Sequence, residues 1–194
     1  MKSSLFLIVT LFSLSSLLST CGGGNVDLDN SGGVPLEVII GNETHLMGPN
    51  SYKSISLEQG AYDIIVRDQE GTILADTAFQ VMEGGLINLA QGQYYIWTDL
   101  YGDPALKEKK LDEDWTEIGD QTFYGEFYPL ETNKLYVEKR WDYGLQENFP
   151  EDLLGWKLAQ EKYLIKSKVF RSEDLVDAYN NLAKKKSAFI RLGL

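Results

Sequence analysis

The chain contains very little cysteine and histidine, with one of each in 194 residues, Cys21 and His45. A single cysteine cannot form an internal disulfide, and the common zinc sites take several ligands from these two residue types. The sequence also lacks the Gly-x-Ser-x-Gly turn of serine hydrolases and the glycine-rich loops that bind phosphate. We therefore expect no catalytic residue, no metal and no cofactor, and we expect His45 to be a surface or partly packed side chain.

Positive charge is also scarce, because 18 Lys and Arg residues stand against 29 Asp and Glu residues and the formal net charge is −11. Such a surface repels nucleic-acid backbones and anionic lipid headgroups. We therefore expect no nucleic-acid partner. A basic patch cannot account for membrane attachment either. The aromatic content of 12% is sufficient for a folded core.

The N-terminus carries an uncharged, largely apolar stretch from Leu5 to Thr20, directly after Lys2. One basic residue followed by a short apolar stretch is typical of a secretory signal peptide. The stretch is shorter than the roughly 20 apolar residues that cross a bilayer. We therefore predict that residues 1–20 are a signal peptide.

This stretch ends in a four-residue motif, Leu18-Ser19-Thr20-Cys21. The motif resembles the lipobox of bacterial lipoproteins, although the family usually has Gly or Ala where Thr20 stands. The resemblance implies that the leader is removed and that Cys21 becomes a lipidated first residue. Several palmitate-type acyl chains on Cys21 would anchor the protein stably in a membrane. The implied location is the cell envelope, and Gly22 after the cysteine favours the outer membrane.

Residues 21–33 are rich in glycine and small polar residues, which predicts a flexible tether after the lipidated cysteine. Within them, "DLDNSG" resembles the start of a calcium-binding loop. That loop needs an acidic residue at its twelfth position, which here is Val38. The preferred interpretation is a solvated acidic tether.

Residues 34–102 are predicted to form an antiparallel β-sandwich, because short strands recur about every ten residues between glycine-containing turns. In the clearest strand, Ile64 and Val66 are expected to point inward with Tyr62, and Asp63 outward. The sequence "LEQGAYDIIVRDQEGTILADTAFQV" resembles PEGA-type and related Ig-like β domains of bacterial envelope proteins. The resemblance implies a non-catalytic scaffold or binding module and transfers no site residues.

Residues 103–194 are predicted to form a small α+β domain after a charged connector. The expected elements are strands at 122–130, 134–145 and 162–170, helices at 150–160 and from 172 to about 186, and a final strand at 188–194. The predicted fold class is therefore α+β overall, with an N-terminal antiparallel Ig-like β-sandwich followed by a small α+β segment.

Aromatic residues supply the one feature of the mature chain that favours a binding site. Tyr95, Trp97 and Tyr101 are expected on one face of a strand, as candidate ligand contacts or as core packing. The same two interpretations apply to the cluster at 123–128 and to Trp141 with Tyr143.

These observations predict a lipid-anchored cell-envelope protein that acts as a binding or scaffolding module for a protein or glycan partner, without catalysis. One alternative is a carbohydrate-binding lipoprotein that uses the aromatic faces. Another is a glycan-cleaving hydrolase that uses a carboxylate pair from Glu126, Glu138 and Asp142. The simpler interpretation of these three residues is solvated charges on strand faces.

Overall fold

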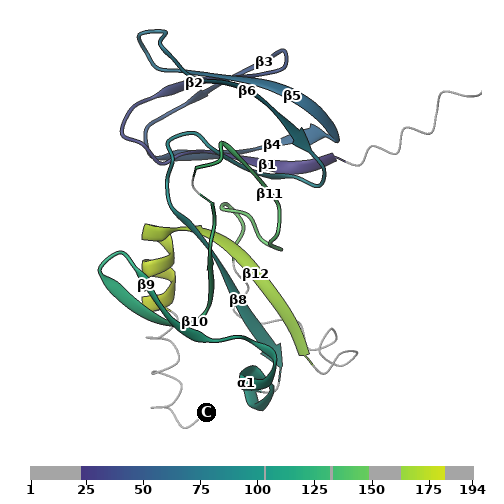
Figure 1. Cartoon of the computed structure of the whole chain (residues 1–194), viewed down its shortest axis with the longest axis vertical. Coiled ribbons are helices and arrows are strands. Elements are labelled where there is room, and N and C mark those ends of the chain that lie inside the picture. Colours follow the sequence, from purple (N-terminus) through teal and green to yellow (C-terminus); the bar gives the residue numbers. More distant parts are fainter. Residues whose placement is uncertain (1–22, 103, 132, 149–162, 182–194) are drawn as a thin grey trace, which may run out of the picture.

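The computed structural model describes residues 23–102, 104–131, 133–148 and 163–181. Cys21, the leader, the expected helix at 150–160 and the expected strand at 188–194 lie outside these residues. Within them, the strands form three four-stranded sheets, and the third sheet extends away from the other two (Figure 1). All strand pairs of these sheets are antiparallel except β1 with β7, which is parallel.

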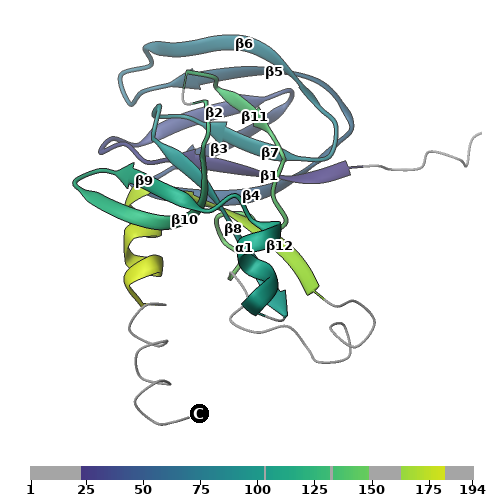
Figure 2. The ribbon, with the colours of Figure 1, turned by 60° about the horizontal axis from the view of Figure 1, so that its bottom comes forward.

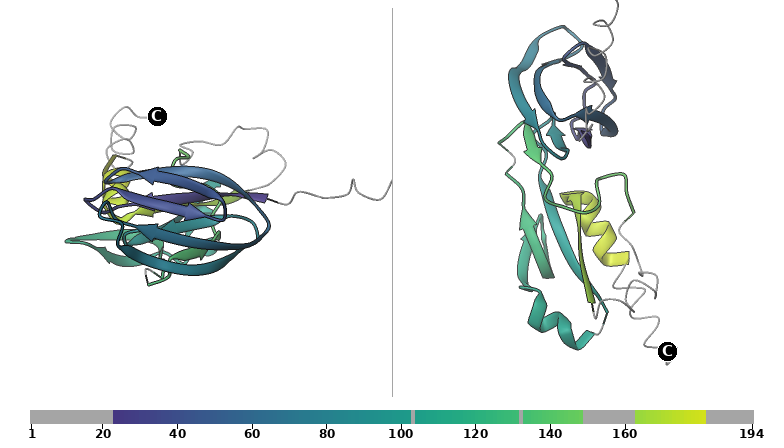
Figure 3. Two further views of the ribbon diagram at one scale, coloured as in Figure 1. Left: turned by 90° about the horizontal axis from the view of Figure 1, so that it is seen from above. Right: turned by 90° about the vertical axis from the view of Figure 1, so that its right-hand side faces the viewer.

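The first two sheets pack face to face as a sandwich. The first sheet has the order β11 (Tyr136–Glu138), β7 (Gly85–Asn88), β1 (Gly23–Asn30), β4 (Ser51–Glu58). The second has the order β3 (Glu43–Met47), β2 (Leu36–Ile40), β5 (Gly60–Arg67), β6 (Ile73–Val81). The two sheets face each other in the ribbon (Figure 3). Their shared core includes Val26, Leu28 and Ile87 from one sheet and Val38, Ile64 and Val66 from the other.

The prediction for β5 is confirmed, because Ile64 and Val66 are buried, Tyr62 packs against the same core and Asp63 is exposed. The period of two along a strand places alternate residues on opposite faces, so the apolar set meets the second sheet of the sandwich.

The third sheet lies on the side of the first sheet that faces away from the second, and its strands run away from the sandwich (Figures 1 and 2). Its order is β12 (Tyr163–Arg171), β8 (Tyr94–Gly102), β10 (Gln121–Pro129), β9 (Asp114–Ile118). One face packs against a helix over residues 172–181, through Leu175. The other face contributes Tyr94, Ile96 and Val169 to a cluster with Leu86 of β7. The first sheet therefore has contacts with both of the other sheets.

The predicted α+β class is wrong, because the described chain is mostly β with little helix. Among the described residues between β8 and β9, the helical elements are a 3₁₀ turn, η1 (Pro104–Leu106), and the four-residue α1 (Lys107–Lys110). The helix over 172–181 agrees with the one expected from residue 172. β10 and β12 agree with the strands expected at 122–130 and 162–170, with Phe123 and Phe127 buried on alternate positions of β10. The strand expected at 134–145 is limited to the three residues of β11.

The expected flexible tether is a strand over most of its described length. β1 pairs with β4 along all eight of its residues and with β7 on its other edge. Val26 and Leu28 alternate with Asp27 and Asp29, so a period of two lies among glycines that suggest a loop.

Strand pairing also crosses the expected domain boundary after residue 102. β8, expected in the first domain, pairs with β10 and β12 of the second segment. β11 comes from the second segment but pairs with β7 of the sandwich.

Candidate functional site

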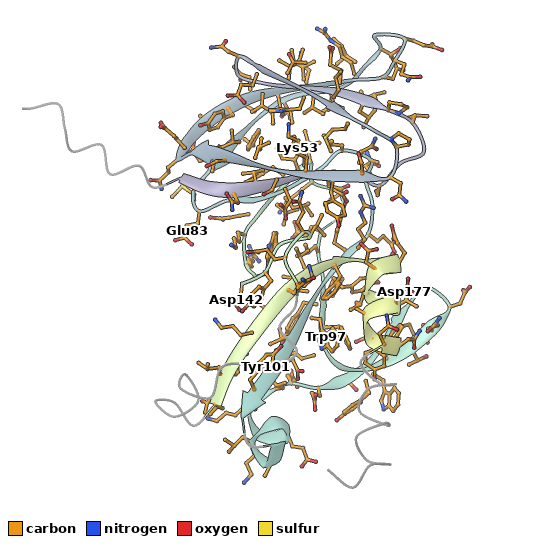
Figure 4. The ribbon with its side chains drawn as sticks, turned by 180° about the vertical axis from the view of Figure 1, so that it is seen from behind. Lys53, Glu83, Trp97, Tyr101, Asp142 and Asp177 are labelled. Carbon is orange, nitrogen blue, oxygen red and sulfur yellow. The ribbon has the colours of Figure 1, made fainter. Side chains whose placement is uncertain are left out.

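The aromatic residues predicted as ligand contacts lie in the interior. Trp97 is 6% exposed, and its ring centroid lies 5.7 Å from Phe127, 6.1 Å from Phe170 and 5.9 Å from Tyr179. Tyr101 is also buried and Tyr95 is half-buried. Figure 4 shows Trp97 and Tyr101 along β8. Of the two interpretations left open, core packing is the one that fits Trp97, because the helix over 172–181 contributes Tyr179 to its surroundings.

The hairpin formed by β9 and β10 also carries aromatic side chains that face solvent. They lie on the side of the hairpin opposite to the cluster around Trp97. Trp115 is 67% exposed, Tyr124 is 45% exposed and Tyr128 is 47% exposed. Trp115 stands opposite Tyr124 across the two strands, with ring centroids 5.3 Å apart. We call this surface the hairpin face, and it consists of Trp115, Glu117, Thr122, Tyr124, Glu126 and Tyr128.

Packing on the other side of the hairpin, against the helix over 172–181, holds the hairpin face in place. Phe123 and Phe127 point the other way, into the cluster that contains Leu175. The hydroxyl of Tyr179 also donates a hydrogen bond to the backbone oxygen of Tyr124, at 3.3 Å. Large apolar side chains exposed together on an ordered strand pair are more informative than scattered ones, because soluble surfaces rarely group them.

Glu126 organises the polar part of the hairpin face. It accepts a hydrogen bond from the Tyr128 hydroxyl at 2.5 Å and another from the backbone N–H of Asp112 at 3.2 Å. The bond to Glu126 and partial burial raise the pKa of Tyr128 to about 12, so this phenol stays neutral at physiological pH. The result is a fixed surface of aromatic rings bordered by carboxylates.

A second polar feature joins the first and third sheets. Asp29 of β1 is fully buried and accepts hydrogen bonds from Arg171 of β12, with Nε 3.0 Å from Oδ2 and a further bond from Nη2. The Tyr94 hydroxyl donates to the same carboxylate, and Arg171 Nη1 donates to Asn50 Oδ1 at 2.6 Å. Burial raises the pKa of Tyr94, and the neighbouring Asp29 raises it further. A buried ion pair of this kind needs every partner, because an unpaired buried charge is costly.

Lys168 of β12 is also buried at this junction. Its ammonium donates to the backbone oxygens of Gly144 at 2.5 Å and Leu145 at 3.1 Å, while Asp27 Oδ2 accepts from Leu145 N–H at 2.9 Å. Burial lowers the pKa of Lys168 to about 8, although nearby carboxylates including Asp27 act in the opposite direction. Asp29 thus joins the first sheet to the third, and Asp27 joins the first sheet to the segment after β11. The calcium-loop resemblance of this stretch does not describe these two residues.

The lowered pKa of Lys168 predicts a pH-dependent stability. The folded chain releases this proton above about pH 8, whereas the unfolded chain holds it to about 10.5, so the unfolded state binds more protons in between. Stability from this group therefore rises with pH across that interval. We expect wild type to gain stability relative to Lys168→Met between about pH 7 and about pH 9.5, measured by urea unfolding. A difference that stays constant with pH would contradict the assignment.

The three carboxylates considered for hydrolysis are held by different surroundings. Glu126 belongs to the hairpin face, and Glu138 is exposed on β11. Asp142 binds Lys166 Nζ at 2.7 Å and the Ser167 N–H at 2.9 Å. Burial would raise the pKa of Asp142, but these contacts lower it on balance. Asp142 therefore stays ionised as part of a surface ion pair.

His45 on β3 is buried, which corrects the expectation of a surface or partly packed side chain. Burial and the charge of Lys53 lower its pKa, so the ring is neutral at pH 7. Among the described residues, its Nε2 is the one buried side-chain nitrogen or oxygen without a hydrogen-bond partner.

Sequence reasoning missed the residues that now stand out, Trp115, Lys168 and Arg171. Trp115 lies at the end of the stretch predicted to be a charged connector. The sequence feature that could have identified a strand there is alternation, with Trp115 and Glu117 on one face and Thr116 and Ile118 on the other. Lys168 and Arg171 carry no local signal, because their hydrogen-bond partners are more than twenty residues away in the chain.

No protein-family model, curated protein or solved structure matches the chain. Within the described ranges, no group of three or more His, Cys, Asp or Glu residues is placed to hold a metal ion. In the same part of the chain, no helix has both the length and the apolar character needed to cross a membrane.

Proposed function

We propose that this chain is a lipid-anchored cell-envelope binding module, held at the membrane through Cys21, that presents the hairpin face to a protein or glycan partner without catalysing a reaction. The observation that carries the binding role is the 67% exposure of Trp115 beside Tyr124 on an ordered hairpin. Exposed aromatic anchors of this kind dominate binding energies at interfaces.

The anchoring part of the proposal rests on the leader and Cys21. Cys21→Ser should abolish lipidation, because serine offers no thiol for the acyl-bearing thioether. Metabolic labelling with a clickable fatty acid, followed by detergent partition, measures this. We expect label and detergent-phase protein for wild type only, and equal labelling of the variant would reject the anchor.

The binding part is tested on the hairpin face. Trp115→Ala should weaken binding of the purified chain to isolated envelope fractions by about tenfold or more, which corresponds to about 1.4 kcal/mol. Leu46→Ala is the matched control, because Leu46 is 79% exposed but lies on β3 of the sandwich.

Treatment of the envelope fraction with protease or with glycan-cleaving enzymes then identifies the class of partner. Equal binding by both variants would remove the hairpin face from the proposal. Turnover of an envelope polymer by the purified chain would overturn the non-catalytic assignment.

A further inference from the structure

A cavity of about 210 Å³ lies between the first sheet and the segment that follows β11. Asn25 and Asp27 of β1 form one wall. The other wall comes from Lys139, Trp141, Gln146 and Glu147. The walls are more than a hundred residues apart in sequence, and ligand sites are often found at such junctions between packed units.

Hydrogen bonds fix the two carboxylates of this cavity before any ligand arrives. Asp27 Oδ2 accepts from the Leu145 N–H at 2.9 Å, and Glu147 Oε2 accepts from the Gly144 N–H at 2.5 Å. A Cβ atom on Gly144 would lie 2.6 Å from Asp27 Oδ2, so a larger residue would require this carboxylate to move. Asp27 therefore holds the segment against β1 with one oxygen, and Glu147 closes a turn within the segment with one oxygen.

The charges around the cavity oppose a ligand of either sign. An anion would meet the carboxylates of Asp27 and Glu147. A compact cation would meet the ammonium of Lys139 in the lining and the field of buried Lys168, which is coupled electrostatically to both carboxylates. The lining instead mixes acceptors with the amides of Asn25 and Gln146, which both donate and accept.

We propose that this cavity binds a single sugar unit. Each hydroxyl of a neutral sugar donates and accepts at once, so it can pair with carboxylates, amides and an ammonium together. The volume suits one sugar ring and is smaller than the roughly 300 Å³ at which drug-sized pockets begin. This site is separate from the hairpin face, so it adds to the proposed function and its test does not depend on the lipid anchor.

The test is ¹⁵N–¹H NMR of the purified mature chain titrated with free glucose, galactose, mannose and N-acetylglucosamine. Methylammonium and acetate serve as charged probes. We expect at least one sugar to shift amide signals at residues 25–27 and 139–147. Single-site affinity for so small a ligand is expected in the millimolar range. No shift at about 50 mM of every sugar, where a millimolar site would be filled, would overturn the proposal.

The lining is then tested with Lys139→Met and Gln146→Ala, whose side chains are half-buried and exposed. We expect at least tenfold weaker sugar binding, with unchanged thermal unfolding. Gln121→Ala, at an exposed position of β10, is the matched control and should bind as wild type does. Equal binding by all three variants, shifts confined to the hairpin face, or tighter binding of a charged probe would each reject a sugar site in this cavity.

Discussion

Replacing Arg171 with methionine is expected to lower the free energy of unfolding by about 3–5 kcal/mol. Asp29 is fully buried and Arg171 is 4% exposed, so the substitution leaves a carboxylate without its counter-ion between two sheets. Urea unfolding at constant pH measures the loss. Lys134→Met is the matched control, because the Lys134–Glu131 ion pair is exposed to solvent and should contribute under about 1 kcal/mol.

A double variant separates pairing from packing at the same position. Asp29→Leu with Arg171→Met replaces both charges by apolar groups, and we expect it to recover most of the stability lost by Arg171→Met alone. Tyr94 would then lose its carboxylate partner, so recovery is expected to be incomplete. A loss for Arg171→Met no larger than that of Lys134→Met would show that the pair does not hold the sheets together.

Trp97→Ala is expected to cost about 3–5 kcal/mol of stability, since it removes a ring packed among Phe127, Phe170 and Tyr179. The control is Trp115→Ala, the same substitution on the hairpin face, which should cost under about 0.5 kcal/mol.

Urea unfolding and the envelope-binding assay together separate the two tryptophans. We expect Trp97→Ala to be destabilised and Trp115→Ala to bind weakly while remaining stable. If Trp115→Ala were destabilised and Trp97→Ala were stable but bound weakly, the assignment of Trp97 to the core and Trp115 to the surface would be wrong.

Local alternation was enough to predict individual strands but not the way they pair. β5 is confirmed down to the direction of Ile64 and Asp63, because its period of two needs no information from the rest of the chain. The assignment of β8 to a third sheet depends on β10 and β12, which lie far along the sequence. Pairing at that separation leaves no local pattern.

Alternation also identifies two faces of a strand without saying which one is covered. Tyr95 and Trp97 were reasonable candidates for a binding face until the helix over 172–181 placed Tyr179 against Trp97. At β1, the glycine-rich composition predicts a flexible tether, although Val26 and Leu28 follow the alternation of a strand. Asp27 and Asp29 look like solvated charges, because their partners on and around β12 cannot be identified from neighbouring residues.

The position of β1 in the middle of its sheet bears on how mechanical force would reach the fold. In the proposed mature chain, Gly22 alone separates Cys21 from Gly23, the first residue of β1. A pull on the anchor would therefore be transmitted directly along β1. Its hydrogen bonds to β4 and β7 lie across the strand, so they would be loaded together in shear instead of being opened one by one. The hydrogen bonds of β1 would therefore resist extraction as a unit.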